Sequence, residues 1–454
     1  LSFLPPAGCS LAILKLHYAR PLGSTRAEGD VALGLILLLA VLAFGATEQW
    51  ARSAVQAAAY SLGIWCFLSN RIGARFVLAA WPLGAALLWA CLQLGADWTV
   101  YRQPTWRFVL DSGAYLTLFA VALHVFGNAG RAISFRRGIL AAGAGIAILS
   151  TLQYFTSEGT IYWVFPVRAG RPFGPFVNPD HYAAFAEIIL PLALFEVVTG
   201  RRHTWLYAGA AAVLYASVVA SASRAGFLLV TVEILVVPLI ALRTRRPLAS
   251  QSGVSRKGLA GALAMTAVCG CIAIGVVGWD TLLRRLNDKD PFRYRRELWV
   301  STLQMIRERP WTGFGMGTFE TVYPGYAGFD TGERIDHAHN DWAEWTAEGG
   351  LPLLAILLIP ALLSVRRTFR HPWALGAHFV LLHSLVDFPM QIPALASLVV
   401  VLLGAVGADG VCLSGPDTIT VYAKRNVRPL RHDRGVLQDQ AVHRQSPEDS
   451  GKLY

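Results

Sequence analysis

The polar stretch 279–349 contains two kinds of residue that could carry chemistry. Arg293, Arg295 and Arg296 form a basic cluster, and the run His337-Ala338-His339-Asn340-Asp341 follows later in the same stretch. An arginine guanidinium matches phosphate oxygens in a bidentate way, and a neutral histidine accepts a proton near physiological pH. Together they predict a site that holds a phosphate or diphosphate and takes a proton from a second group.

The histidine run leads into a predicted helix. Asn340 or Asp336 can cap this helix, and Gly349-Gly350 ends it. His339 would then lie at the helix N-terminus, where the dipole disfavours the imidazolium form and leaves a neutral base. This makes His339 a candidate general base.

Two other interpretations of the His-x-His spacing stay open. The pair could bind a metal ion, but the nearby carboxylates do not form an HExxH-like pattern and the arginines already supply positive charge, so we predict no metal site. His337 and His339 could also serve only to cap the helix.

A glycine-rich turn separates the basic cluster from the histidines. Gly313-Phe314-Gly315-Met316-Gly317 suggests a nucleotide-binding loop at first. We reject that interpretation, because no strand precedes the turn, no Gly-Lys-Ser/Thr motif follows it, and it connects two helices. One helix starts at Asp290-Pro291 and runs to Arg309 with one apolar face, and the other is a short segment around Thr318 to Tyr326. The turn is therefore predicted to be a hinge between two surface helices.

The rest of the chain has the composition of a membrane protein. Of its 454 residues, 54% are hydrophobic and 15% are charged, and the mean hydropathy is +0.45, which excludes an ordinary soluble domain. The net charge of +11 is spread over short basic groups between apolar runs, so we predict no binding to nucleic acid. The six cysteines lie mostly in or beside apolar runs without paired spacing, which argues against a zinc site or a disulfide framework.

Apolar runs long enough to cross a bilayer can be counted from residue 31 onward. A membrane-spanning helix needs about 20 residues of low polarity, and on that basis we predict an all-α polytopic membrane protein with about twelve transmembrane helices. The expected spans are 31–47, 51–69, 76–95, 107–126, 138–156, 179–199, 204–222, 225–242, 258–278, 350–366, 373–388 and 392–409. The junction from Ser221 to Arg224 is tight enough for one bent helix in place of two.

The distribution of Lys and Arg predicts the orientation. Basic residues gather in alternate connections, around Arg71, Arg131, Arg201, Arg243 and Arg366, and connections of this kind lie in the cytoplasm. Both termini are then cytoplasmic, and the stretch 279–349 faces the periplasm. The predicted regions are an N-terminal segment of uncertain order (1–30), transmembrane helices 1–9 (31–278), a periplasmic catalytic loop (279–349), transmembrane helices 10–12 (350–409) and a flexible cytoplasmic tail (410–454).

Several arginines run against this charge distribution. They are Arg168, Arg171, Arg224, Arg284, Arg285, Arg293, Arg295 and Arg296. All of them fall in outer connections, several at the membrane boundary, where a cation is costly unless an anion compensates it. Any one of them could reach toward lipid headgroups or pair with Asp288, Asp290 or Glu297. For the group, a bound phosphate or diphosphate is the better explanation.

Five short motifs follow one another between Asn178 and Pro393. They are Asn178-Pro179-Asp180-His181-Tyr182-Ala183, Ser221-Ala222-Ser223-Arg224-Ala225-Gly226, Arg295-Arg296-Glu297-Leu298-Trp299 leading to Arg309-Pro310-Trp311-Thr312-Gly313-Phe314-Gly315, His337-Ala338-His339-Asn340-Asp341, and Leu382-His383-Ser384-Leu385-Val386-Asp387-Phe388-Pro389. Their order resembles the O-antigen ligase and polymerase superfamily of bacterial envelope glycosyltransferases. The first five expected spans and the tail carry no such signature.

The resemblance implies a metal-independent glycosyltransferase of the GT-C type that needs no cofactor. Its donor is a glycan linked to undecaprenyl diphosphate, and a hydroxyl of the acceptor attacks the anomeric carbon. By motif, the loop histidine of the family matches His339, and its diphosphate-binding arginines match Arg224 and Arg295, with Arg296 as a neighbour. Supporting positions are His337, Asn340, Asp341, Arg293 and His181.

The acceptor separates three functions that share this donor. An O-antigen ligase passes the glycan to lipid A-core, a polymerase passes it to another lipid-linked repeat, and an O-oligosaccharyltransferase passes it to a Ser or Thr of a protein. We predict the ligase, in the bacterial inner membrane with its active site facing the periplasm. A lipid or polysaccharide transporter is an alternative of another class, but transporters place polar sites near the bilayer midplane between internal repeats.

Overall fold

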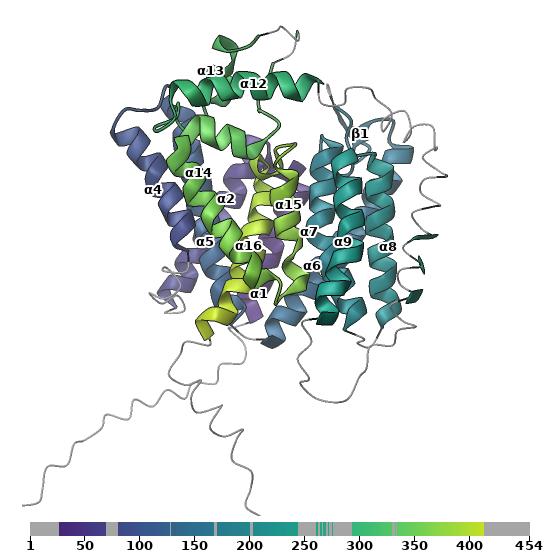
Figure 1. Ribbon diagram of the computed structural model, residues 1–454. Coiled ribbons are helices and arrows are strands. Elements are labelled where there is room, and N and C mark those ends of the chain that lie inside the picture. Colours follow the sequence, from purple (N-terminus) through teal and green to yellow (C-terminus); the bar gives the residue numbers. More distant parts are fainter. Residues whose placement is uncertain are drawn as a thin grey trace, which may run out of the picture. The chain divides into compact units, whose positions relative to one another are not determined.

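Apolar helices pack side by side along their length, and helix α12 (Arg293–Glu308) lies across one end of them (Figure 1). The computed structural model describes residues 27–69, 80–127, 129–167, 170–199, 203–243, 293–328 and 334–412, with Gly332 and scattered positions between 260 and 275. All of these except Cys412 belong to the compact unit Leu1–Val411.

The described elements are helices with one short hairpin. The α-helices are α1 (Ala27–Leu42), α2 (Gln49–Leu68), α4 (Trp81–Gly95), α5 (Arg102–Val125), α6 (Ala129–Thr156), α7 (Pro179–Val198), α8 (Thr204–Ser221), α9 (Arg224–Arg243), α12, α13 (Phe319–Val322), α14 (Asp341–Thr368), α15 (Gly376–His383) and α16 (Pro393–Cys412). Single 3-10 turns are η1 (Phe44–Ala46), η2 (Tyr323–Gly325), η3 (Pro372–Ala374) and η4 (Pro389–Gln391). Strands β1 (Thr160–Ile161) and β2 (Phe165–Pro166) pair antiparallel.

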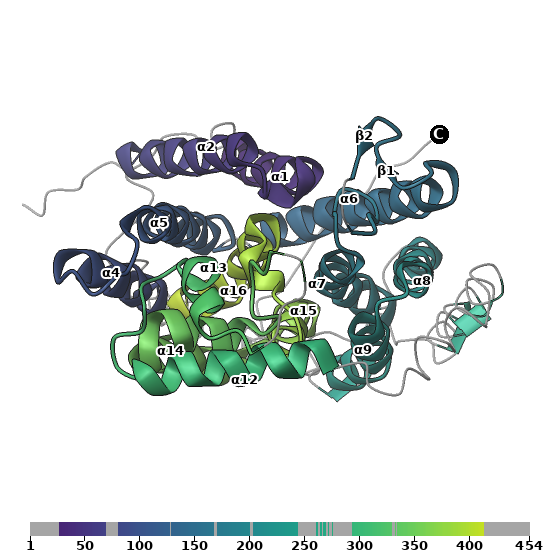
Figure 2. The same cartoon turned by 90° about the horizontal axis from the view of Figure 1, so that it is seen from above.

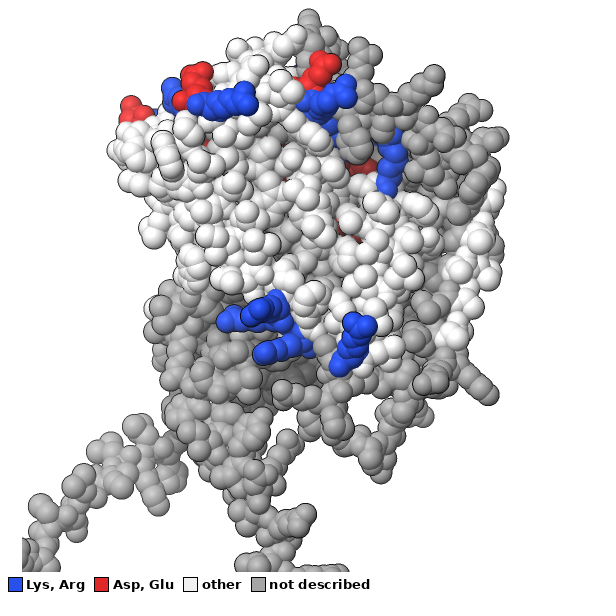
Figure 3. All heavy atoms as spheres, in the orientation of Figure 1, with Lys and Arg blue, Asp and Glu red and all other residues white. Residues whose placement is uncertain are grey.

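Six of the described helices are long and apolar enough to cross a membrane. They are Arg102–Val125, Gly130–Thr156, Pro179–Val198, Thr204–Ser221, Arg224–Arg243 and Asp341–Thr368, and the shorter apolar helices are Gly29–Leu42, Trp81–Gly95 and Pro393–Ala408. On the face in Figure 3, charged side chains gather toward the two ends and leave a nearly uncharged band between them. The prediction of an all-α membrane protein is confirmed, whereas the number of twelve spans stays a prediction.

Several predicted features lie wholly or mostly outside the described residues. They are the segment 1–30, the span 258–278, the tail 410–454, the helix start at Asp290-Pro291 and the side chains of Arg168, Arg284, Arg285 and Arg293. The junction from Ser221 to Arg224 separates two helices, α8 and α9, because Ala222 adopts a left-handed conformation (φ 55°) that ends α8.

The expected span 373–388 is not one continuous helix, and its crossing of the membrane stays a prediction. The structure has the 3-10 turn η3, the eight-residue helix α15 and then a non-helical segment before η4. The eight residues of α15 rise about 12 Å, so this helix by itself is shorter than the hydrocarbon core of a bilayer is thick. The chain leaves the helix because the carbonyl oxygen of Ser384 accepts a hydrogen bond from the backbone N–H of Asp341 (2.9 Å), which joins this segment to the start of α14.

Helix α7 lies at the centre of the bundle, surrounded by α6, α8, α9 and α15 (Figure 2). Apart from its first turn, Glu187 and Glu196 it is apolar, and it is almost completely buried, as expected for a helix enclosed by others. Asn178 caps it by accepting a hydrogen bond from the backbone N–H of Asp180 (2.9 Å), and Pro179 occupies its first position. The cap fixes Asp180 and His181 in the first turn, at the end of the bundle crossed by α12.

Helix α12 is amphipathic, as predicted. Its inner face buries Leu298, Thr302 and Met305 completely, while Val300 and Leu303 are exposed. The inner face packs on a small hydrophobic cluster formed by the chain after α12, including Phe314 and Phe319. The predicted short helical segment that follows is also present, as α13 and η2.

The glycine-rich turn is a packed junction and not a free hinge. A Cβ at Gly313 would lie 2.2 Å from the carbonyl oxygen of Glu348, and one at Gly315 would lie 2.0 Å from Oγ1 of Thr99. Gly315 also has φ 107°, which L side chains rarely adopt. The turn therefore seats the end of α12 against α14 and the α4–α5 connection.

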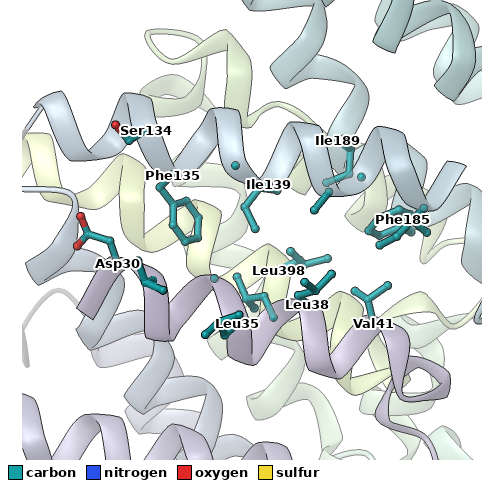
Figure 4. A pocket seen from close by; sticks show the side chains of 17 residues that line it. Asp30, Leu35, Leu38, Val41, Ser134, Phe135, Ile139, Phe185, Ile189 and Leu398 are labelled. Atoms are coloured by element: carbon teal, nitrogen blue, oxygen red, sulfur yellow. The ribbon is translucent and has the colours of Figure 1, made fainter. Parts of the chain in front are cut away.

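An apolar pocket of about 310 Å³ lies among α1, α6, α7 and α16 (Figure 4). Leu35 and Leu38 of α1 face Ile139 of α6 and Ile189 of α7 across it, and Asp30 stands at one end. None of the residues that line it belongs to the predicted site.

Candidate active site

His339 is held at the entrance to α14 by contacts from two other segments. Asn340 caps α14, as predicted, by accepting a hydrogen bond from the backbone N–H of Ala343 (3.0 Å). Nδ1 of His339 lies 2.9 Å from Oδ1 of Asp387, in the segment after α15. The indole Nε1–H of Trp299, on α12, donates to the carbonyl oxygen of His339 (3.3 Å). The ring is thus oriented by a carboxylate while its side chain stays 23% exposed.

Asp387 is a fully buried carboxylate that connects the histidine to an arginine. Its Oδ2 lies 3.6 Å from a guanidinium nitrogen of Arg295. Burial acts to raise the pKa of Asp387, but the hydrogen bond with His339 and the nearby Arg295 guanidinium hold that pKa below its usual range. An ionised Asp387 accepts a hydrogen bond from the Nδ1–H of His339, and this tautomer leaves the lone pair on Nε2.

Arg295 lies between two carboxylates from distant parts of the chain. Besides Asp387, its guanidinium is 3.2 Å from Oδ2 of Asp180 in the first turn of α7. The side chain of Arg295 is 20% exposed. Arg296, the next residue along α12, is exposed. The structure therefore assigns the central cation of the cluster to Arg295.

His337 forms a second pair with a carboxylate. Its Nδ1 lies 2.8 Å from Oε1 of Glu344, whose other oxygen accepts the backbone N–H of Ala338 (2.7 Å). Burial acts to lower the pKa of His337, but the Glu344 carboxylate outweighs it and raises the pKa to about 9. His337 is therefore an imidazolium at neutral pH.

The ring of Phe388 contacts all three histidines of the site. His337 stacks on it at 4.4 Å between ring centroids, and His339 and His181 approach its edge or face at 4.8 and 4.7 Å. His181 is buried, and its Nε2 has no hydrogen-bond partner among the described residues. The contact with Phe388 places His181 in the site. The sequence alone did not indicate a role for this residue.

Arg224 begins α9, one helix away from the histidines. A Cβ at Gly226 would lie 2.3 Å from the Cβ of Ala183, so the start of α9 packs against α7 just after His181. Arg171 supports the turn before α9 by donating to the carbonyl oxygen of Ser221 (2.9 Å). The exposed Arg224 side chain thus belongs to the same end of α7 as Asp180, but the His339–Asp387–Arg295 contacts do not include it.

Asp341 supports the backbone near the site and is completely buried. Its Oδ2 accepts the backbone N–H of Met390 (3.0 Å), close to Phe388. Glu348, seven residues further along α14, acts in the same way: its Oε1 accepts a hydrogen bond from the backbone N–H of Phe319 (2.8 Å). Carboxylates in the first turns of α14 therefore hold the surrounding loops.

Sequence reasoning missed four site residues: Asp180, Glu344, Asp387 and Phe388. Asp180, Asp387 and Phe388 occur in the motifs noted above, but without a role. A carboxylate inside an expected membrane span was a signal for Asp387, because such residues are rare and usually functional. Among the described residues, no group of three or more His, Cys, Asp or Glu is arranged to hold a metal ion.

A comparison with known proteins finds one matching family model. Residues 209–358 match the family model described as O-antigen ligase, and this stretch includes Arg224, Arg295 and His339. No curated protein and no solved structure matches the chain. Over residues 209–358, the chain is therefore similar to the O-antigen ligase family.

Proposed function

We propose that this protein is an O-antigen ligase that transfers a glycan from undecaprenyl diphosphate to a hydroxyl of lipid A-core. The observation that supports it most is the line of contacts from His339 through the buried Asp387 to Arg295. It combines an oriented imidazole with an arginine whose side chain is partly exposed. Transfer from a diphosphate donor requires both of these functions.

In the proposed reaction, Nε2 of His339 takes the proton of the acceptor hydroxyl. The hydroxyl oxygen forms a bond to the anomeric carbon, and the bond from that carbon to the diphosphate oxygen breaks, so that its electron pair leaves with the diphosphate. Arg295 and Arg224 bind the diphosphate, and the imidazolium of His337 adds positive charge close to Nε2. Arg296 and Arg293 are candidates for outer contacts to the same group. This supply of charge by side chains is the basis for proposing a metal-independent reaction.

A groove of about 470 Å³ supports a lipid-linked donor. Trp342 and Met390 line its end nearest the site, each three residues beyond a member of the His339–Asp387 pair. The groove continues among α4, α5, α14, α15 and α16 to Arg367 and Gly407, and its lining is mainly apolar. Such a surface suits a polyprenyl chain whose diphosphate lies at the histidines.

The proposed setting is the inner membrane, with the site on the periplasmic side. The charge distribution of the sequence supports this orientation, because the connections rich in Lys and Arg alternate with the outer ones. Both termini would then lie in the cytoplasm, and the stretch 279–349 would form the periplasmic loop.

Product analysis tests the proposal. Purified protein is given one undecaprenyl-diphosphate glycan together with lipid A-core, a second lipid-linked repeat, or a Ser/Thr-containing peptide, and the products are identified by mass spectrometry. Glycan on lipid A-core that is absent with His339→Ala supports the ligase. Product on either other acceptor alone would replace it with a polymerase or an O-oligosaccharyltransferase. Movement of lipid across liposomes without a new glycosidic bond would favour a transporter.

A further inference from the structure

Glu187 of α7 and His383 of α15 form a buried pair beneath the site. Nδ1 of His383 lies 2.8 Å from Oε1 of Glu187, and the two residues are 1% and 0% exposed. The other nitrogen of His383 and the other oxygen of Glu187 have no hydrogen-bond partner among the described residues. A single hydrogen bond therefore links the two buried side chains.

The pair joins the two segments that hold Arg295. Glu187 lies seven residues after Asp180, so both project from the same face of α7 two turns apart. His383 lies four residues before Asp387, whose backbone N–H donates to the carbonyl oxygen of His383 (3.1 Å). The Glu187–His383 contact is therefore a cross-link directly below the Asp180–Arg295–Asp387 contacts.

Backbone packing at the same place makes this cross-link rigid. A Cβ at Gly376, the first residue of α15, would lie 2.3 Å from the carbonyl oxygen of Glu187. The start of α15 thus rests on the α7 backbone, and its last residue, His383, is tied to the Glu187 side chain. Helix α15 is fixed to α7 at both ends, and it ends four residues before Asp387.

Stability alone does not explain an acidic and a basic side chain at this depth. Removing two such groups from water costs several kcal/mol per charge, and well-packed apolar residues of similar size are often equally stable or more so. Polar pairs of this kind are retained where they specify one arrangement of the helices or serve a function.

We propose that Glu187 and His383 are positioning residues that set the separation of Asp180 and Asp387. They thereby keep Arg295 between the two carboxylates and Nδ1 of His339 on Asp387. The effect on catalysis rests on the proposed function, whereas the effect on the geometry does not.

Paired substitutions separate positioning from stability. Glu187→Leu/His383→Leu removes the link and leaves no unpaired charge, so the protein should fold and keep its thermal stability in detergent. Glu187→Gln keeps a hydrogen bond to Nδ1 of His383 without the negative charge. We expect the double-leucine variant to lose turnover on the order of 10²-fold at saturating donor, while Glu187→Gln stays close to wild type.

Amide hydrogen exchange gives a readout independent of turnover. In the double-leucine variant, exchange should become roughly tenfold faster in residues 384–391, which carry Asp387 and Phe388, and stay unchanged in α4 and α5. The control is Glu196→Gln, a buried carboxylate of α7 that pairs with Arg136 and Arg137 away from the site. It should leave both exchange at 384–391 and turnover per folded molecule unchanged.

Wild-type exchange at 384–391 in a stable double-leucine variant would overturn the proposal. So would loss of turnover in Glu187→Gln equal to that of the double-leucine variant, because the hydrogen-bonded link is then not what matters. If exchange rises as expected but wild-type protein transfers no glycan to any acceptor, the positioning role stands and the proposed function fails.

Discussion

Two histidine–carboxylate pairs meet at the entrance to α14, and they differ in what else the carboxylate contacts. His337 and Glu344 are 2.8 Å apart, and His339 and Asp387 are 2.9 Å apart. The second oxygen of Glu344 accepts a hydrogen bond from the backbone N–H of Ala338, whereas the second oxygen of Asp387 forms an ion pair with Arg295. The first pair is a closed unit with a fixed imidazolium. The second pair joins a histidine to Arg295, whose side chain is partly exposed.

The substitution His339→Ala gives the strongest test of the difference between the two histidine–carboxylate pairs. If His339 is the base, we expect turnover to fall by about 10²–10⁴-fold with little change in donor binding. The measurement is initial rate of glycan transfer in detergent, with His203→Asn as the control, a residue before α8. Transfer at the wild-type rate in His339→Ala would remove this histidine from the reaction.

Asp387→Asn should have an effect nearly as large. An amide can present its NH2 group to Nδ1, which favours the tautomer with the proton on Nε2 and removes the lone pair needed there. We expect turnover to drop at least about 10²-fold, and acetate addition should not restore it. Asp111→Asn is a matched control, since Asp111 is a largely buried carboxylate paired with Arg52 elsewhere in the bundle. Equal losses in both variants would indicate a general effect of buried carboxylates.

The substitution Arg295→Lys tests what the arginine beside the second oxygen of Asp387 contributes. A lysine keeps the charge but cannot bind a diphosphate in the bidentate way, so the dissociation constant for the donor should rise about tenfold. Binding of a radiolabelled lipid diphosphate to protein in nanodiscs measures it. Arg296→Lys, on the neighbouring exposed position of α12, should change binding less. The reverse order would transfer the central role to Arg296.

Glu344→Gln should have the smallest effect, seen mainly in its pH dependence. The folded-state pKa of His337 is raised to about 9, above an unfolded value of about 6.5. The pair therefore stabilises the protein fully below about pH 6.5, and this contribution is lost as the pH rises through about 9. Without the carboxylate, His337 should lose its proton at lower pH, so the alkaline limbs of thermal stability and turnover should both shift down.

Stability and turnover followed between about pH 6 and pH 10 test this shift. Glu320→Gln, which changes a carboxylate paired with the exposed Arg334, is the control. Unchanged alkaline limbs in Glu344→Gln would show that the charge of His337 does not depend on Glu344.

Local sequence rules predicted the elements that depend on local interactions. The cap at Asn340, the amphipathic face of α12 and the break at Gly350, where φ is 71°, all follow from neighbouring residues. The segment 373–388 is as apolar as a membrane span, and its short helix results from contacts with α7 and α14. A hydropathy profile contains no information about those contacts.

The candidate site could be predicted only in part, because some of its contacts join distant parts of the chain. His339, Arg295 and Arg224 stand in recognisable motifs, and the structure brings the first two to one carboxylate. That carboxylate, Asp387, lies 48 positions from His339 along the chain, and Asp180 lies 115 positions from Arg295. Pairings at such separations depend on how the helices pack.

Under the proposed function, helix α12 would couple the bilayer to the reaction. It lies across the end of the apolar bundle, it carries Arg295, and Trp299 on the same helix holds the backbone of His339. A bilayer that is too thick or too thin shifts an amphipathic surface helix relative to the spans beneath it. We therefore expect turnover in nanodiscs to pass through a maximum as acyl-chain length is varied, so that lipid composition acts as a control on rate.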